Sequence, residues 1–218
     1  MEIKVIITGA TGMVGEGVLL ECVNNPSVKE VLIVSRKHYS LNHPKLKELI
    51  VPDFFHLEEF LAELKGFDAC FYCAGISSVG LKEDEYSRIT YDTTLAFANK
   101  LLTLNPTMIF NFVSGSATDS SESGGVMWAR VKGKTENALM KLPFKNQFNF
   151  RPGIMKPMKG QLNVKPMVRI LIFLLTPFFP KKTLTIKLVG RAMINSVLKG
   201  YPKKILEVSD IRNLGTEM

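Results

Sequence analysis

IKVIITGATGMVGEG, the stretch Ile3–Gly17, decides the fold of this chain. It opens with a β-branched run that is typical of a strand buried on both faces of a parallel sheet. The run ends at Thr8 and is followed by Gly9-x-x-Gly12-x-x-Gly15, after which apolar residues recur at helical spacing. The glycines are therefore expected at a strand-to-helix turn, where a dinucleotide pyrophosphate can rest on the helix amino end. The alternative is an ordinary turn whose glycines serve packing alone.

The bulk properties indicate one globular domain. The chain has 218 residues, 46% of them hydrophobic and 22% charged, which is enough for a full core. Its net charge is +8, but the basic residues are scattered and no aromatic residues interleave with them. We therefore expect a basic surface or an anionic cofactor and no nucleic-acid partner. The amino end lacks the pattern of a signal peptide, and a cytoplasmic location is expected.

The cysteines predict neither a disulfide framework nor a metal site. There are three of them, and Cys70 and Cys73 form a C-x-x-C pair inside a predicted strand. Residues three apart on a strand point to opposite faces, so the two thiols cannot close on one metal ion. We interpret them as buried thiols in a reducing compartment.

The end of the second predicted strand indicates which cofactor the chain binds. The strand covers residues 31–34 and is followed by Ser35, Arg36 and Lys37. In a dinucleotide fold an acidic residue at this point takes the ribose 2′-hydroxyl, whereas an arginine accommodates a 2′-phosphate. A guanidinium can hold that phosphate through two parallel hydrogen bonds. NADP(H) is therefore favoured over NAD(H), the alternative being that Arg36 is a surface charge.

Strands and helices alternate along the chain, which predicts an α/β fold with a doubly wound, Rossmann-like parallel sheet. The pattern predicts a Rossmann core over residues 1–155 and a small C-terminal segment on the substrate side over 156–218. Further strands are expected near 49–51, 68–74, 108–113, 148–150 and 205–208, and helices near 13–23, 56–64, 83–104, 126–142 and 183–198.

On these motifs the chain resembles the atypical, epimerase-like members of the short-chain dehydrogenase/reductase superfamily. The resemblance covers about residues 1–155 and rests on TGATGMVG, a serine after the fifth strand, VKGKTE and RPGI. The segment Ser114–Glu136 is most similar to small reductases of the Tat-interacting-protein type. The resemblance implies an NAD(P)-dependent oxidoreductase or epimerase with a small-molecule substrate.

The same resemblance implies a Ser-Tyr-Lys site, with the last two residues four apart on one helix face. Lys132 matches the lysine, and Ser114 and Ser116 are both candidates for the serine. Trp128 stands where the tyrosine is expected. An indole N–H donates a hydrogen bond but does not titrate in this range, so another group or water must supply the proton.

The residues expected to bind the cofactor come from the glycine turn, the strand ends and the lysine. They are Thr8, Gly9, Thr11, Gly12, Met13, Val14, Gly15, Ser35, Arg36, Lys37, Asp53, Cys73, Ala74, Gly75, Lys132, Pro152, Gly153 and Ile154. All but the lysine belong to the glycine turn and first helix turn or to segments at or just beyond the carboxyl ends of predicted strands, the edge at which open α/β sheets bind ligands.

The segment Met167–Phe179, MVRILIFLLTPFF, is strongly apolar. It is too short to cross a bilayer, which takes about 20 residues. A core or pocket-lining helix is expected, and an interfacial membrane helix is the alternative.

Two hypotheses follow for function. The first is an NADP(H)-dependent oxidoreductase or epimerase-like enzyme acting on a small, fairly apolar carbonyl or hydroxyl compound. The second is a non-catalytic NADP(H)-binding module with a regulatory or membrane-peripheral role. The sequence leaves the oligomeric state open.

Overall fold

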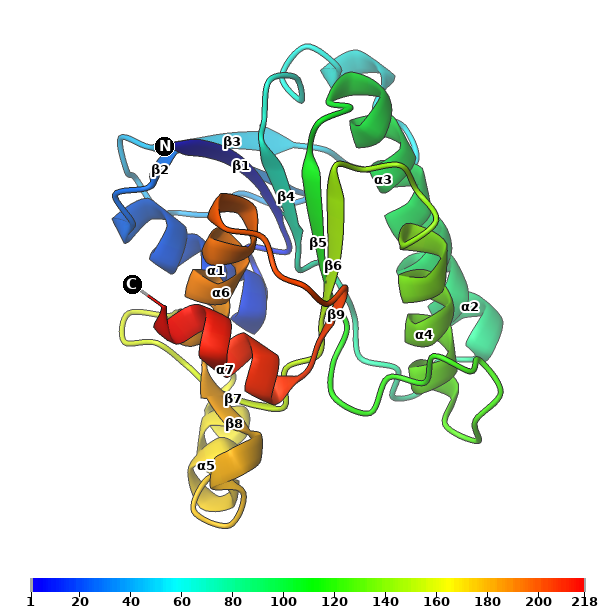
Figure 1. The fold of residues 1–218 in the computed structure, drawn as a ribbon, viewed down its shortest axis with the longest axis vertical. Helices are drawn as coiled ribbons and strands as arrows, with labels where there is room; N and C mark the ends of the chain where they lie inside the picture. Colours follow the sequence, from blue (N-terminus) through cyan, green and yellow to red (C-terminus); the bar gives the residue numbers. More distant parts are fainter. Residues whose placement is uncertain (1, 218) are drawn as a thin grey trace.

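A seven-stranded parallel sheet forms the centre of the molecule in the computed structural model, which describes residues 2–217 (Figure 1). Every neighbouring pair of strands is parallel, which confirms the predicted Rossmann-like fold. Across the sheet the strands are β3 (Leu46–Ile50), β2 (Val28–Ser35), β1 (Ile3–Thr8), β4 (Ala69–Tyr72), β5 (Ile109–Val113), β6 (Asn146–Phe150) and β9 (Ile205–Leu206).

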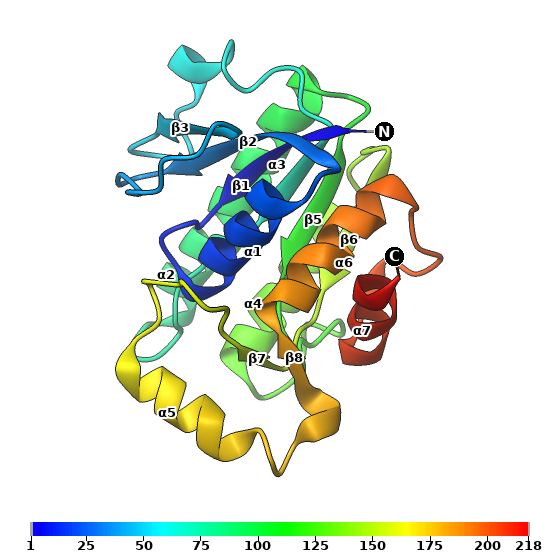
Figure 2. The same ribbon diagram turned by 90° about the vertical axis from the view of Figure 1, so that its left-hand side faces the viewer.

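Helices cover both faces of this sheet (Figures 1 and 2). One face packs against α1 (Met13–Asn24), α6 (Ile186–Leu198) and α7 (Val208–Thr216). The other face packs against α3 (Thr93–Leu104) and α4 (Met127–Leu139). The short helix α2 (Glu83–Ser87) and the π-helical segment η2 (Arg88–Asp92) lead directly into α3.

Alternation along the strands sends side chains into two separate cores. In β1, Val5 and Ile7 belong to the core under α1 and α6, while Ile6 belongs to the core under α3. Cys70 and Cys73 divide in the same way: Cys70 belongs to the second core and Cys73 packs against the first. The predicted opposite orientation of the two thiols is confirmed.

The C-terminal region contributes to the main sheet and to its helical layers. Residues 156–218 are predicted as a substrate-side segment packed on the core; in the structure β9 is the seventh strand of the main sheet and α6 lies beside α1. These elements complete the Rossmann layers because their apolar residues fill the core under α1. The strand predicted at 205–208 is only two residues long and runs into α7, which the sequence analysis missed.

The helix predicted at residues 56–64 is also wrong. Only Glu58–Phe60 forms a short 3₁₀ turn there. Leu57 and Leu64 are buried at helical spacing, yet the segment is shorter than an isolated helix needs and runs through turns.

A small second sheet carries an arm away from the body of the molecule. Its strands β7 (Ile154–Lys156) and β8 (Thr183–Thr185) are parallel to each other. Between them lie α5 (Pro166–Leu175) and the short turn η3 (Pro180–Lys182). In both views α5 lies beyond the sheet and its covering helices (Figures 1 and 2).

Candidate functional site

The glycine turn between β1 and α1 is built on backbone contacts that exclude larger residues. Gly9 has φ +73°, and a Cβ added there would lie 2.7 Å from backbone atoms of Cys73 and Ala74. A Cβ on Gly15 would lie 2.1 Å from the Gly9 carbonyl oxygen. Thr8 Oγ1 accepts a hydrogen bond from the Ala74 amide at 3.1 Å, which ties the ends of β1 and β4 together. Both glycines therefore have a steric role that no other residue can fill.

The amino end of α1 presents free donors to the space above this turn. Gly12 is the N-cap and supplies no side chain to the helix end. The Gly12 amide donates to Gly9 O, and the Glu16 amide donates to Gly12 O, each at 2.9 Å. Within residues 2–217 the amides of Met13, Val14 and Gly15 donate to no acceptor. Three unpaired donors at the positive end of a helix dipole are suited to an anion.

A cleft of about 480 Å³ opens beside this helix end. It lies between the glycine turn, the ends of β2 and β4, the segment after β3, and the start of α3. Its walls are Gly9, Thr11, Gly12, Val34, Ser35, Arg36, Lys37, Pro52, Asp53, Phe54, Tyr72, Cys73, Ala74, Gly75, Ile76, Ile89 and Thr93. The size and the elongated set of strand ends suit a nucleotide.

Many of the predicted cofactor residues line this cleft, and others do not. Those in the walls come from the glycine turn, the tip of β2, Asp53 and the segment Cys73–Gly75. The segment Pro152–Ile154 lies toward the arm instead: Ile154 pairs with Thr183 in the second sheet. Ile89 and Thr93 also line the cleft and were not among the predicted cofactor residues; their spacing of four places them on one face of the η2–α3 helix.

Arg36 has a free guanidinium at the tip of β2. It is exposed, lines the cleft and makes no ion pair or side-chain hydrogen bond within residues 2–217. The turn that carries it is fixed by Ser35, whose hydroxyl donates to Lys37 O at 2.7 Å. Asp53 is the one acidic residue in the cleft walls, and its Oδ1 accepts from the Phe55 amide at 3.0 Å.

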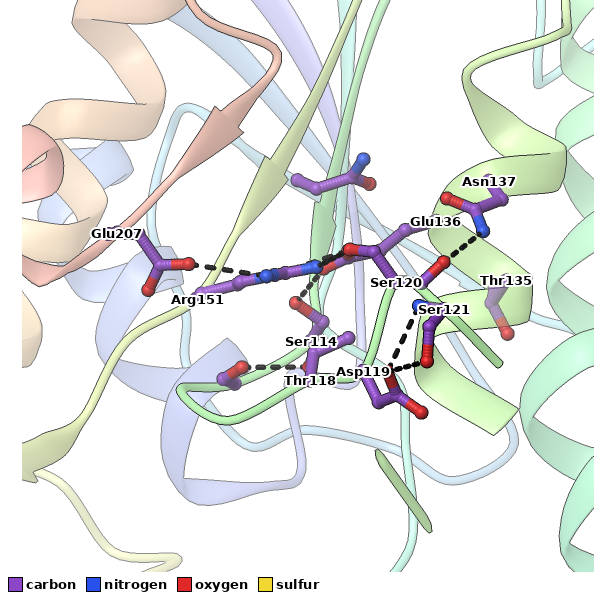
Figure 3. Close-up of polar contacts among 12 residues, drawn as sticks. Ser114, Thr118, Asp119, Ser120, Ser121, Thr135, Glu136, Asn137, Arg151 and Glu207 are labelled. Atoms are coloured by element: carbon purple, nitrogen blue, oxygen red, sulfur yellow. Dashed lines mark hydrogen bonds and ion pairs between the residues drawn. The ribbon is translucent and has the colours of Figure 1, made fainter. Parts of the chain in front are cut away.

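The two candidate serines have different surroundings. Ser114 is buried, with its Oγ 2.5 Å from Glu136 Oε1 and 3.1 Å from Phe150 O (Figure 3). The Ser114 hydroxyl therefore already donates its hydrogen bond within the protein. Ser116 is half-buried; its amide donates to Pro152 O at 2.9 Å, and its hydroxyl has no partner among the described residues. Ala117 follows with φ +70°, a strained conformation of the kind that clusters at functional sites.

A buried ion pair holds the loop of these serines to the sheet (Figure 3). Glu136 is fully buried on α4, and Arg151 Nε donates to its two carboxylate oxygens at 3.0 and 3.2 Å. Arg151 Nη2 also contacts Glu136 and donates to Ser120 Oγ at 2.6 Å, while Nη1 donates to Glu207 Oε1 at 3.2 Å. The pair therefore joins α4, the end of β6, the loop after β5 and the start of α7.

Lys132 lies one helix turn from Glu136 on α4. Its ammonium donates to the carbonyl oxygen of Ser114, at the end of β5. Burial lowers the pKa of Lys132 from 10.5 to about 8, and the negative charge of Glu136 partly opposes that shift. The helix can lie this close to the loop because of Gly133, where a Cβ would lie 1.7 Å from Asp119 O.

Trp128 precedes Lys132 by four residues on the same helix and is half-buried. Its indole N–H makes no hydrogen bond within the described part of the chain, so it is free to donate to a ligand oxygen. Tyr39, Tyr72, Tyr86 and Tyr201 do not replace the missing phenol, because desolvation raises the pKa of each of them. Lys132, one helix turn after Trp128, has a pKa lowered by burial to about 8.

The sequence model of the NAD dependent epimerase/dehydratase family matches residues 5–133, which is more than half of the chain. The chain belongs to this family. The matched region runs from β1 through the glycine turn to α4, and it ends one residue after Lys132. The predicted superfamily is thereby confirmed.

Two curated relatives of this chain come from fungi. This chain is 30% identical over 141 residues to Leucinostatins biosynthesis cluster protein T of Purpureocillium lilacinum, and the alignment covers 63% of this chain and 51% of the relative. It is 25% identical over 158 residues to Protein fmp52, mitochondrial, of Emericella nidulans, covering 69% and 66%. The chain thus spans between half and two thirds of the length of these relatives.

Solved structures show the same fold at low identity. The enzyme WbmF of Bordetella bronchiseptica, solved with NAD⁺, superposes with a TM-score of 0.69 at 15% identity, covering 99% of this chain and 77% of WbmF. A short chain dehydrogenase/reductase of Saccharomyces cerevisiae gives 0.69 at 13% identity, covering 97% and 99%.

Proposed function

We propose that this protein is an NADP(H)-dependent oxidoreductase that acts on a small, apolar carbonyl or hydroxyl compound, with Lys132 in the role of proton donor. The observation that carries the proposal is the cleft itself. Gly9, Thr11 and Gly12, at the amino end of α1, line it together with Arg36, whose guanidinium is unpaired within residues 2–217. Ser116 and Lys132 do not line this cleft; they lie at the carboxyl end of β5, on the same edge of the parallel sheet.

The cleft residues fit the cofactor that the family uses. The amides of Met13, Val14 and Gly15 suit the pyrophosphate, since three donors and the helix dipole point at one place. Arg36 suits a 2′-phosphate, because its guanidinium makes no ion pair or hydrogen bond within residues 2–217 that would have to break before it binds the phosphate. When bound, NADPH supplies the hydride.

The remaining chemistry falls to side chains of the loop after β5 and of α4. Ser116 orients the carbonyl oxygen, because its hydroxyl is free whereas that of Ser114 is engaged by Glu136. Trp128 donates its N–H or forms an apolar wall. The Lys132 ammonium gives its proton to the substrate oxygen as the C=O bond becomes C–O–H, and water then reprotonates the amine. A pKa of about 8 keeps this acid charged, yet ready to donate, near neutral pH.

Cofactor choice is tested by thermal unfolding with NADPH or NADH. At 100 times its Kd a ligand stabilises the native state by about 2.7 kcal/mol, which is roughly 5–10 °C for a domain of this size. We expect NADPH to raise the Tm more than NADH, and Arg36→Ala to remove that difference. Lys29→Ala, an exposed lysine at the other end of β2, is the matched control. Equal shifts with both nucleotides in the wild type would refute the role of Arg36.

The second candidate function is a non-catalytic NADP(H)-binding module. The presence of Trp128 favours it, because the site then lacks the titrating phenol that its family resemblance implies. The two functions differ in turnover, since a binding module shows the NADPH-dependent rise in Tm without oxidising the cofactor when carbonyl compounds are added.

A further inference from the structure

The arm between β7 and β8, residues 157–182, exposes an unusual amount of apolar surface. No residue of α5 is buried, which rules out the core helix that was one of the two sequence predictions; the other, a pocket-lining helix, agrees with the cavity beside α5. Met167, Phe173 and Phe178 keep 81%, 78% and 79% of their surface exposed. Of the large hydrophobic side chains exposed in the described residues, most belong to this arm: Leu162, Met167, Ile170, Leu171, Phe173, Leu174, Phe178 and Phe179. Large apolar side chains exposed together on one segment are typical of an interaction site.

The stretch of chain that contains the arm carries charge of one sign. Residues 137–206 contain fourteen lysines and arginines and no aspartate or glutamate. Five lysines lie on the arm or at its base, and their ammonium groups make no ion pair or hydrogen bond within residues 2–217: Lys156, Lys159, Lys165, Lys181 and Lys182. The occupant of this surface must therefore be both apolar and anionic.

A second copy of the chain does not meet this requirement. Pairing two arms would cover the apolar side chains but would bring two lysine-rich segments that contain no acidic residue together, and the like charges would repel. Nucleic acid would satisfy the lysines but not the exposed phenylalanines and leucines. An anionic bilayer surface offers headgroup phosphates and acyl chains at the same place.

We propose that the arm docks on the surface of an anionic phospholipid membrane, with α5 lying in the interface and the lysines facing the headgroups. Among the described residues no helix is both long and apolar enough to cross a bilayer. The ten residues of α5 extend about 15 Å, half the thickness of the hydrocarbon core. A cavity of about 450 Å³ between α5 and residues 156–159 is lined by Lys156, Lys159, Arg169 and Phe173 among others, a mixture suited to a headgroup with its first acyl carbons.

The base of the arm is tied to the cofactor helix, so docking would also orient the cleft. Glu16, fully buried in the first turn of α1, accepts hydrogen bonds from the amides of Leu162 and Asn163, each at 2.8 Å. Gln161 Nε2 donates to Met13 O at 2.6 Å. Membrane attachment through the arm would thus hold the cleft near the bilayer, where apolar substrates concentrate.

The test is co-sedimentation of the 218-residue chain with vesicles of neutral phosphatidylcholine or of phosphatidylcholine mixed with phosphatidylglycerol. We expect binding to the anionic vesicles that weakens with added salt. The triple variant Leu171→Ser, Phe173→Ser, Leu174→Ser should lose it. Lys181→Glu with Lys182→Glu should weaken it by about tenfold or more, since each basic residue near such a surface contributes about 1 kcal/mol.

Val79→Ser is the matched control, because Val79 is an apolar residue 87% exposed outside the arm. Thermal unfolding followed by circular dichroism is the control for folding of each variant. Binding that survives the triple substitution, or that is equal on neutral and anionic vesicles, would overturn the proposal. A second result would also overturn it: a wild-type protein that is dimeric in sedimentation velocity and does not bind vesicles, with the dimer lost in the triple variant. That result would assign the apolar surface to a second copy of the chain.

Discussion

Glu136→Gln should destabilise the protein strongly, although it changes only one atom of the side chain. Glu136 is fully buried and Arg151 is 8% exposed, so the substitution leaves a guanidinium without its main counter-charge in the interior. Breaking a buried ion pair by removing one partner costs about 3–5 kcal/mol. Glu207, at 3.2 Å from Arg151, retains part of the compensation, and we therefore expect a loss near the lower end, about 3 kcal/mol.

The assay is urea unfolding at neutral pH followed by circular dichroism, with m-values compared to confirm that both proteins unfold in the same way. Glu207→Gln is the matched control. It removes a carboxylate that contacts the same guanidinium, but that carboxylate is half exposed and should contribute only about 1 kcal/mol or less. A loss below about 1 kcal/mol for Glu136→Gln, or equal losses for the two variants, would refute the interpretation of this pair as the buried link between α4 and β6.

Glu136→Gln has a second consequence that a purely structural role would not produce. The Glu136 charge raises the pKa of Lys132 against the effect of burial. Its removal should therefore lower the pKa of Lys132 further, and the alkaline limb of a pH–rate profile for reduction should move to lower pH. If the alkaline limb of the pH–rate profile does not move, Lys132 is not the group whose titration controls turnover.

Two further predictions concern Lys132 and Glu16. Because the pKa of Lys132 is about 8 when folded and 10.5 when unfolded, the unfolded chain binds more protons between these values. The free-energy cost of burying the charged lysine therefore declines, and the stability of the fold rises, as pH increases through that window. Lys132→Met should lack this dependence. The unfolding free energy of the wild type relative to that of the variant should therefore rise by about 2 kcal/mol from about pH 8 to pH 10. A difference in unfolding free energy that does not change with pH would contradict the lowered pKa. Glu16→Ala should leave the amides of Leu162 and Asn163 without an acceptor, cost about 2 kcal/mol and speed proteolysis within the arm, whereas an unchanged cleavage rate would show that Glu16 does not anchor it.

The sequence predicted the central fold well because its signals are local. The β-branched strand, the three glycines and the helical spacing after them lie within fifteen residues, and Gly9 and Gly15 have steric roles that their pattern indicates. The position of Arg36 at the tip of β2 could also be predicted, since Arg36 directly follows a buried strand in the sequence. Each of these features depends on neighbours in the chain.

The parts that failed depend on partners far apart in the sequence. Ser114 and Ser116 could not be separated without Glu136, which lies 22 residues from Ser114 and engages its hydroxyl. Hydropathy alone could not distinguish a buried helix at 167–179 from an exposed one, because it does not record what covers the helix. The two-residue strand β9 is defined by its pairing with β6 and not by its own composition.

The most direct test of the account is NADPH oxidation by the purified protein across a panel of small apolar aldehydes and ketones. Wild type, Lys132→Met, Ser116→Ala and Trp128→Tyr should be compared. We predict wild-type turnover that declines above about pH 8, is nearly abolished by Lys132→Met and is reduced by Ser116→Ala. Absence of turnover in the wild type together with its appearance in Trp128→Tyr would contradict the account and establish a cofactor-binding module instead.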